Sequence, residues 1–329
     1  MHADDPTDST PDESEAFYDP RRRMEAFRLS PLANRKFDFE PPRTNYFTVV
    51  WVEAGSGFFW ADAAQHNFGP DQLLFFVPYQ YLRFRQEQPA RGSVLCFHAN
   101  FLCVETFHEE TGCSGALFND PYGPPIVRLD ERTKEDVTAI VSWMRREQEE
   151  RQLAYQDTLL SYMKILLVLA ARRKAASSPS CDAAKVEFRH PVINRLRDLI
   201  EEHYRVLHAP SDYAALLHMT PKALGRCVRQ QLGTTLTELI RGRILTHAKW
   251  QLLHTLKPVK EVAAEVGFQD ELYFSRLFKK ATGVSPKFFR QFETEIRGGS
   301  NLSMSSAHAP IPGPAEDAED ARNSTRGGE

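Results

Sequence analysis

The sequence has few cysteines and no long apolar run, and both absences exclude classes of protein. Its five cysteines show no Cys-x-x-Cys spacing, so a disulfide framework is not predicted. The longest apolar run, Ile165–Ala171, is far shorter than the roughly 20 residues that cross a bilayer. Met1–Glu15 is acidic and polar, unlike a signal peptide. We therefore expect a soluble, cytoplasmic protein.

Motifs of the common enzyme classes are missing as well. The sequence contains no nucleophile elbow, no phosphate-binding loop and no dinucleotide fingerprint, and each of these requires glycines at fixed positions. We therefore predict that the protein is not an enzyme, and we expect neither a cofactor nor a catalytic metal.

Charge is distributed unevenly along the chain. The overall net charge is -3, but Asp182–Arg297 holds 19 Lys and Arg against 13 Asp and Glu, a net charge of +6. The rest of the chain holds 22 basic and 31 acidic residues, a net charge of -9. A basic C-terminal segment is typical of nucleic-acid binding.

Composition divides the chain into five segments. Residues 1–16 and 298–329 are rich in polar and acidic residues and in proline, and we predict that both tails are disordered. A Ser-rich stretch marks a linker at 175–187. The linker separates a domain over 17–174 from a second domain over 188–297.

The first domain has a β pattern followed by a helical one. Aromatic and β-branched runs at Tyr46–Glu53 and Phe58–Ala61 are separated by Gly55-Ser-Gly57, which predicts a hairpin. Three further strands are expected, at Leu73–Val77, Tyr81–Arg85 and Val94–His98. Several short strands with turns between them favour a small barrel or sandwich.

Two amphipathic helices are predicted next, at Glu131–Glu150 and Leu153–Arg173, because their apolar residues recur at helical spacing. One interpretation is that both helices pack on the strands and complete their core. The other is that they form a dimer interface, so that a homodimer is expected.

An internal repeat with an offset of 50 residues lies in the second domain. Residues 220–229, TPKALGRCVR, align with residues 270–279, DELYFSRLFK. In each copy an N-cap residue begins a helix, two apolar residues at i and i+4 face a core, and a glycine follows the helix. The matched pairs are Thr220 and Asp270, Leu224 and Phe274, Arg226 and Arg276, Val228 and Phe278, and Gly233 and Gly283.

A short helix precedes each capped helix, at Asp212–Leu217 and Val259–Val266, and this pairing is typical of helix-turn-helix units. The capped helix of such a unit enters the major groove of DNA. We therefore predict that the outward residues contact bases or phosphates: Thr220, Lys222, Ala223, Arg226 and Arg229 in the first unit, and Glu271, Leu272, Tyr273, Arg276, Lys279 and Lys280 in the second. Arginine pairs well with guanine and Glu accepts from cytosine, whereas Lys279 and Lys280 suit phosphates.

One long helix is expected between the two units, over Thr235–Thr255. At 1.5 Å per residue it would be about 30 Å long, close to the roughly 34 Å of one turn of DNA. A connector of this length could place the two units in successive major grooves.

The second domain resembles the AraC/XylS family of transcription regulators. The resemblance is carried by Val262-Ala-Ala-Glu-Val-Gly-Phe268, by Tyr273–Lys280, and by Thr282-Gly-Val-Ser-Pro286 followed by Phe289-Arg290. It covers roughly Pro191 to Phe292. In the first unit, Gly225 and Cys227 depart from the family pattern.

The resemblance implies a transcription regulator, usually an activator, that binds double-stranded promoter DNA and contacts RNA polymerase. It also implies a fold of the multidomain α+β class. An N-terminal, cupin-like small β-barrel with two helices would bind a small-molecule effector, and a C-terminal all-α domain would hold two helix-turn-helix units joined by a long helix. Four aromatic residues are expected to line the effector pocket: Tyr46, Phe58, Trp60 and Phe84.

Two alternatives stay open for the N-terminal domain. It could bind no small molecule and only dimerise or bind a protein partner, in which case side chains would fill its barrel. Separately, Cys96, His98, Cys103, His108 and Cys113 are residue types that bind zinc or sense oxidation, although their spacing fits no common zinc motif. The His-x-His cluster of cupin metal enzymes is missing: the strand at Tyr46–Glu53 contains no His, and His66 stands alone.

Overall fold

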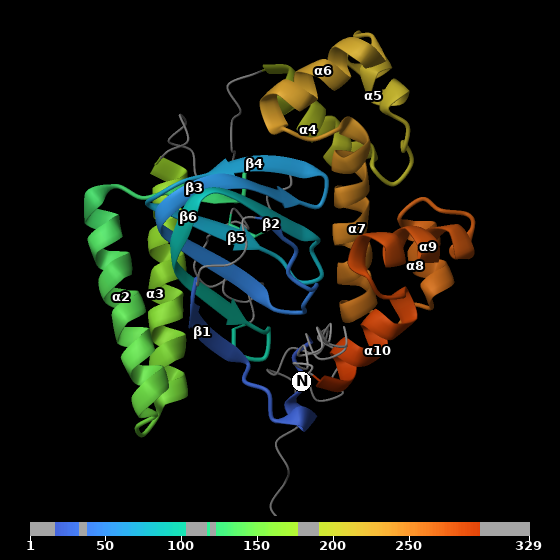
Figure 1. The fold of residues 1–329 in the computed structure, drawn as a ribbon. Helices are drawn as coiled ribbons and strands as arrows, with labels where there is room; N and C mark the ends of the chain where they lie inside the picture. Colours follow the sequence, from blue (N-terminus) through green and yellow to red (C-terminus); the bar gives the residue numbers. More distant parts are fainter. Residues whose placement is uncertain (1–16, 33–37, 103–116, 119–122, 177–190, 297–329) are drawn as a thin grey trace, which may run out of the picture.

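A computed structural model describes residues 17–32, 38–102, 117–118, 123–176 and 191–296. The described residues between 17 and 176, called the N-terminal domain below, form one sheet and two long helices, and residues 191–296, called the C-terminal domain, hold helices and no strand (Figure 1). The predicted change from a β-rich to a helical region is confirmed. Two residues of the predicted linker, Ala175 and Ala176, belong to the preceding helix; its remainder and both predicted tails lie outside the described residues.

The sheet is antiparallel throughout and has the strand order β1-β6-β3-β5-β7, with β2 paired to β6 and β4 paired to β3. Its strands are β1 (Phe27–Pro31), β2 (Asp38–Phe39), β3 (Phe47–Ala61), β4 (Ala64–Phe68), β5 (Gln72–Phe76), β6 (Leu82–Phe97) and β7 (Ile126–Arg128). Among the described strands this path begins at β1 and ends at β7. Closure into a cupin-like barrel stays a prediction.

The predicted hairpin at Gly55-Ser-Gly57 is wrong, because β3 runs through it as one continuous strand. The register between β3 and β6 shifts three times between Val52 and Gly57. A methyl group at Gly55 would lie 2.4 Å from the Pro89 carbonyl oxygen, and one at Gly57 would lie 2.2 Å from the Arg85 carbonyl oxygen. These glycines therefore permit two bent strands to approach closely, which is the other common use of glycine in a strand.

The strand β6 likewise replaces two separate predicted strands, at Tyr81–Arg85 and Val94–His98. The predicted break between them contains Pro89 and Gly92, which usually interrupt strands. Gly92 lies where a side chain would overlap the Trp51 carbonyl oxygen. The strand therefore continues through this break at a point of close backbone contact.

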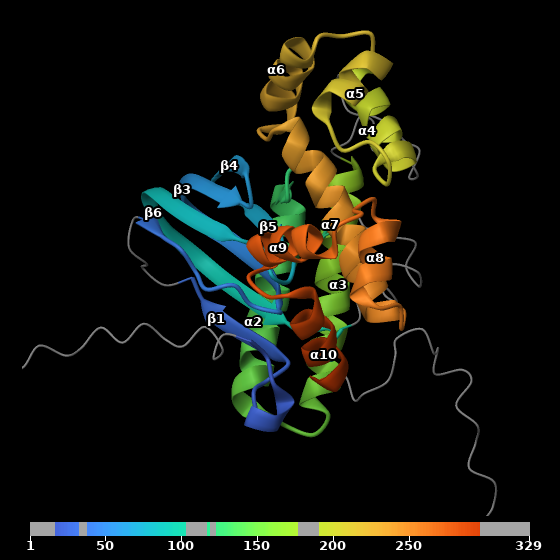
Figure 2. The same cartoon turned by 90° about the vertical axis from the view of Figure 1, so that its right-hand side faces the viewer.

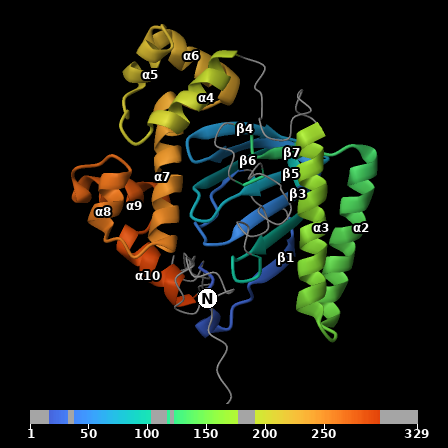
Figure 3. The same ribbon diagram turned by 180° about the vertical axis from the view of Figure 1, so that it is seen from behind.

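Each face of the sheet has its own apolar core. One face packs against α2 (Glu131–Glu150) and α3 (Tyr155–Ala176), which lie side by side across it (Figure 3). Val137 and Met144 of α2 and Met163 of α3 are fully buried there. The interpretation that these helices complete the core of the strands is confirmed, while their role in a homodimer stays a prediction. The other face encloses a second cluster that includes Phe59, Leu74 and Phe84.

The C-terminal domain contains seven helices among its described residues. They are α4 (Pro191–His203), α5 (Pro210–Leu216), α6 (Pro221–Leu232), α7 (Leu236–His254), α8 (Val259–Glu265), α9 (Glu271–Thr282) and α10 (Pro286–Ile296). One continuous core joins both halves through α7, whose Leu239, Ile240 and Ile244 are buried. Among the described residues, no helix combines the length and apolarity that a membrane-spanning segment requires.

Gly242 lies in the middle of α7, where glycine is a poor helix former. A Cβ added there would meet no atom within 4 Å. We therefore expect Gly242→Ala to raise the free energy of unfolding by about 0.5–1 kcal/mol, because alanine loses less backbone entropy on folding. Chemical denaturation followed by circular dichroism measures the change, and a destabilised variant would show that α7 needs its glycine.

Candidate nucleic-acid interface

The first capped helix, α6, begins and ends at the residues that its sequence predicts. Thr220 is its N-cap, and its Oγ1 accepts a hydrogen bond from the Ala223 N–H at 3.2 Å. Pro221 occupies the first helical position, where no backbone N–H is needed. Gly233 ends the helix with a left-handed φ of 68°, a conformation that glycine adopts without steric cost.

The second capped helix, α9, repeats this design 50 residues later and has the same length of 12 residues. Asp270 is its N-cap, and one carboxylate oxygen accepts from the Leu272 and Tyr273 N–H groups at 2.8 and 3.2 Å. Gly283 ends it with a φ of 85°. The acidic cap also suits the positive end of the helix dipole.

The turn before each capped helix is repeated as well. Met219 donates its N–H to the Ala214 carbonyl at 2.9 Å, and Phe268 donates its N–H to the Ala263 carbonyl at 2.8 Å. Both alanines are buried, so α5 and α8 can cross close to the helices that follow them. Both halves of the C-terminal domain are therefore helix-turn-helix units.

The inward residues of the capped helices hold them on the core. Leu224, Val228, Phe274 and Phe278 are fully buried, as their matched spacing predicts. None of the eleven predicted DNA-contacting residues is buried. Six of the eleven side chains are basic and one, Glu271, is acidic, so together they carry a net charge of +5 at neutral pH.

The long helix α7 connects the two units that contain the capped helices. It is 19 residues long, or about 28 Å at 1.5 Å per residue. Both α6 and α9 lie on one side of α7, whereas α5 and α8 lie on the other (Figure 2). Both capped helices therefore lie on the same side of a connector about as long as one turn of DNA.

A shallow hollow beside α6 was not anticipated from the sequence. It has a volume of about 410 Å³ and is lined by Gly225, Arg226, Arg229, Gln230, Thr235 and Leu236. Thr235 is the N-cap of α7, and its side chain accepts from the Glu238 N–H at 3.2 Å. The spacing of Thr235 and Glu238 is that of a capping box, and this signal marks the start of α7 in the sequence.

The surroundings of His247 and Cys227, two side chains of this domain, shift their pKa values. Burial, followed by the nearby guanidinium groups of Arg205 and Arg243, lowers the pKa of His247, so this ring stays neutral near pH 7. Its Nδ1 lies 3.0 Å from the Tyr204 hydroxyl, which joins α7 to the end of α4. Burial raises the pKa of the Cys227 thiol on α6, which keeps it protonated and a poor nucleophile.

The four residues predicted to line an effector pocket do not line one cavity. Phe84 belongs to the apolar cluster on the sheet face away from α2 and α3, where it contacts Phe59. Phe58 and Trp60 alternate with Phe59 along β3 and are only partly buried, because successive side chains of a strand point to opposite faces. Tyr46 belongs to a separate cluster, and its hydroxyl donates to the Glu25 carbonyl at 2.9 Å.

The predicted Cys and His cluster is described only in part, because Cys103, His108 and Cys113 lie outside the described residues. Cys96 lies 3.7 Å from the Thr48 hydroxyl. The His98 ring is buried, and its Nδ1 accepts from the Asn100 N–H at 3.1 Å. Within the described part of the chain, no group of three or more His, Cys, Asp and Glu side chains could hold a metal ion.

Comparison with known proteins finds a matching domain family and several similar proteins. A helix-turn-helix domain family model matches residues 213–291. The arabinose operon regulatory protein of Salmonella typhimurium is 38% identical over 104 residues, which are 30% of this chain and 37% of that protein. The transcriptional activator RhaR of an Enterobacter species is 25% identical over 174 residues, 53% of this chain and 60% of that protein.

Among solved structures, the C-terminal domain of AraT, a response regulator from Geobacillus stearothermophilus, is 34% identical and covers 31% of this chain and 86% of its own, with a TM-score of 0.31. At that score the superposition adds nothing to the description of the fold.

The match to the arabinose operon regulator spans little more than a third of that relative's length. These relatives are transcription regulators, not enzymes, in agreement with the prediction for this chain. The family model runs from α5 into α10 and so includes α7 and both capped helices. The C-terminal domain is therefore a helix-turn-helix domain of the AraC type.

Proposed function

We propose that this chain is a sequence-specific regulator of transcription that inserts α6 and α9 into successive major grooves of one promoter duplex. One observation carries the proposal: two capped helices of equal length, which carry exposed basic residues, lie on the same side of a connector about 28 Å long. Relatives named as transcriptional activators support the proposal that the regulator is an activator.

The residues of the two helices divide by the chemistry of their side chains. Arg226 and Arg276 occupy equivalent outward positions and suit the paired acceptors of guanine. Glu271, in the first turn of α9, suits the amino group of cytosine. Lys279 and Lys280, in the last turn, suit phosphates, which fix the register of the protein on the duplex.

In vitro selection tests this proposal directly. The purified full-length chain would be used to select from a pool of random duplexes long enough for three helical turns. We expect two enriched sequence blocks about one helical turn apart, because two recognition helices read one face of the duplex. Recovery of sequences with no shared block would overturn the proposal. Binding across the host genome would then identify the target promoters.

The phosphate role of Lys280 makes a separate prediction. Lys280→Ala is expected to weaken binding to selected and to random duplexes by the same factor, because phosphates carry no sequence information. It should also reduce the slope of log affinity against log salt concentration by about one unit, since one counterion fewer is released. Fluorescence anisotropy across a salt series measures both effects. An effect confined to the selected duplex would assign Lys280 to base recognition instead.

For the N-terminal domain, the packing inside the sheet favours a role through contacts rather than through an enclosed effector. The cavity lined there by residues such as Val52, Phe68 and Phe84 has a volume of about 10 Å³, which is room for about one water molecule. Ligand pockets are typically 300–1,000 Å³. This cavity is too small for such a ligand, which supports the alternative that the domain only dimerises or binds a protein partner. Binding of a small-molecule effector elsewhere in this domain stays the other proposal.

A further inference from the structure

The two domains meet at the ends of both recognition helices. At the end of α6, a methyl group added to Gly233 would lie 2.9 Å from the Gln65 carbonyl oxygen of β4. At the end of α9, a methyl group on Gly283 would lie 3.2 Å from a guanidinium nitrogen of Arg43. Each C-cap glycine of the repeat therefore lies against the N-terminal domain.

Arg43 makes a direct bond at the second of these points. Its two terminal nitrogens donate to the Lys280 carbonyl oxygen at 3.3 and 3.4 Å. This carbonyl lies in the last turn of α9, where the helix leaves its own carbonyl groups without helical partners. A cation at this end is also favoured by the helix dipole. Arg43 thus acts on α9 from the other domain.

A buried carboxylate fixes the helix that follows α9. Glu293 of α10 is 2% exposed and lies against three side chains of the N-terminal domain. It accepts from the Tyr79 hydroxyl, and from the Asn45 amide at 3.4 Å. The Nε2 atom of His98 lies 3.5 Å from its other oxygen.

The hydrogen bonds of His98 orient its ring toward Glu293. Because Nδ1 accepts from the Asn100 N–H, a neutral ring carries its proton on Nε2, the atom that faces the carboxylate. All three groups around Glu293 can therefore donate, and all three come from the N-terminal domain. A buried charge needs such partners, since removing it from water without them is costly.

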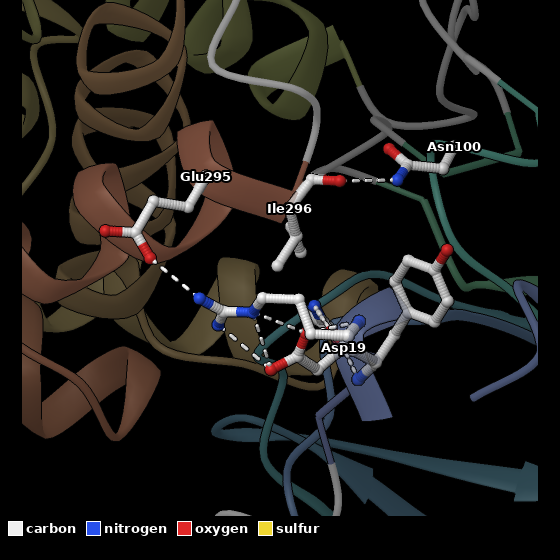
Figure 4. A network of polar contacts seen from close by, with 7 residues as sticks. Asp19, Asn100, Glu295 and Ile296 are labelled. Atoms are coloured by element: carbon white, nitrogen blue, oxygen red, sulfur yellow. Dashed lines mark hydrogen bonds and ion pairs between the residues drawn. The ribbon is translucent and has the colours of Figure 1, made fainter. Parts of the chain in front are cut away.

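Further contacts join the two domains around Glu293. The Asn100 side chain donates to the Ile296 carbonyl at 2.8 Å, and Arg21 pairs with Glu295 at 3.2 Å while also bonding Asp19 (Figure 4). On α7, the Lys249 ammonium group lies 3.4 Å from the Pro78 carbonyl oxygen. Burial lowers the pKa of Lys249. The N-terminal domain therefore touches α6, α7, α9 and α10.

We infer that the N-terminal domain is the support that fixes the distance and angle between the two recognition helices. The units are joined in sequence by α7 alone, and a single long helix can bend at little cost. The contacts of the N-terminal domain with the ends of α6 and α9 add a second connection between the two helix-turn-helix units. Arg43 and Glu293 are then positioning residues, which act on DNA through α9.

This inference rests on the proposed function and adds a specific consequence. A DNA-binding protein whose two recognition helices are held rigidly discriminates between spacings of the two sequence blocks in its site, because only one spacing fits without distortion. A DNA-binding protein whose two recognition helices move relative to each other accepts several spacings. The N-terminal domain would therefore select the spacing of the site, while α6 and α9 select its sequence.

Two variants on the N-terminal side test this role without altering the recognition helices. Arg43→Ala removes an accessible side chain, and Tyr79→Phe removes only the hydroxyl that Glu293 accepts from, leaving the ring packed on Phe17 and Phe289. Arg83→Ala is the matched control, because Arg83 pairs with Asp38 within the N-terminal domain at 2.7 Å. All are made in the full-length chain.

The first measurement needs no DNA. Spin labels at Gln231 on α6 and at Lys279 on α9, both exposed, report the distance between the two helices. We expect one narrow distance distribution in the parent chain and in Arg83→Ala, and a clearly broader one in Arg43→Ala and Tyr79→Phe. Equally narrow distributions in all four proteins would overturn the inference, whatever the chain does on DNA.

The second measurement uses duplexes obtained by selection, with the two blocks separated in single base-pair steps across half a helical turn. We expect the parent chain to prefer one spacing by about tenfold or more, and the two variants to lose most of that preference. Their affinity for a duplex with one block should stay within about twofold of the parent value. Equal losses on one-block and two-block duplexes would overturn the inference. A parent chain without sequence preference would refute the proposed function, and the label distances would still decide the positioning role.

Discussion

Replacing Arg226 and Arg276 together with alanine is expected to weaken binding to the selected two-block duplex by about 2–6 kcal/mol, because each arginine that reads a base contributes about 1–3 kcal/mol. The two residues lie on different helices at equivalent, accessible positions of the repeat. Since they share no partner, their effects should add to within about 0.5 kcal/mol. Binding to random duplexes should change much less.

Competition binding with the parent chain, the two single variants and the double variant forms a complete cycle for this test. Arg195→Ala is the matched control: Arg195 is exposed on α4, outside the two capped helices. The control should leave the preference between selected and random duplexes intact. If the double variant loses affinity for both kinds of duplex equally, the two arginines bind phosphates and the assignment to bases is wrong.

Removing the ring of Phe274 is expected to have the largest effect on stability. This side chain is fully buried in the C-terminal core, where its ring centroid lies 5.8 Å from that of Phe268 and 5.9 Å from that of Phe278. Phe274→Ala would lose the burial of the ring and leave a cavity, so we expect the free energy of unfolding to fall by about 3–5 kcal/mol.

Amide hydrogen exchange of α7 and α9 measures this loss within the C-terminal domain, which matters because a two-domain chain need not unfold in one step. Phe288→Ala is the control, since Phe288 is 45% exposed and stacks only on Phe292. Its effect should be about 1 kcal/mol or less. Similar losses in the two variants would mean that the aromatic core around Phe274 rearranges to fill the space.

The helices of the C-terminal domain could be predicted closely because their boundaries are encoded locally. Thr220 and Asp270 cap their own helices, and Gly233 and Gly283 end them, so that no distant contact is needed to place these boundaries. The repeat added a second, independent copy of the same signals. The predicted connector over Thr235–Thr255 agrees with α7 to within one residue at each end.

The sheet was predicted less well because a glycine in a strand-like segment can mark either a turn or a close approach of two strands. At Gly55 and Gly57 the sequence favours a turn, yet the glycines serve the close approach of β3 to β6. The difference depends on which strand lies opposite, and that is a long-range property. The surroundings of two predicted effector residues depend on the same kind of long-range pairing: Phe58 and Trp60 share a strand with Phe59 but lie on its other face.

The pocket around Glu293 is assembled from Asn45, Tyr79 and His98, which are far apart in the sequence, so no local pattern predicts it. A partial signal does exist in α10. Its buried residues are Pro286, Phe289, Glu293 and Ile296, so a carboxylate occupies the apolar stripe of the helix. Such a residue indicates a partner on another element, although not which one.

The same pocket limits how freely the two domains can be recombined. Regulators are often engineered as chimeras, in which the DNA-binding half of one protein is fused to the sensing half of another. Here the DNA-binding half contains one side of a shared buried site, and a foreign partner without equivalents of Asn45, Tyr79 and His98 would leave the Glu293 carboxylate buried without donors. A working chimera of this chain therefore has to carry those three residues along, or replace Glu293 by an apolar residue at the same time.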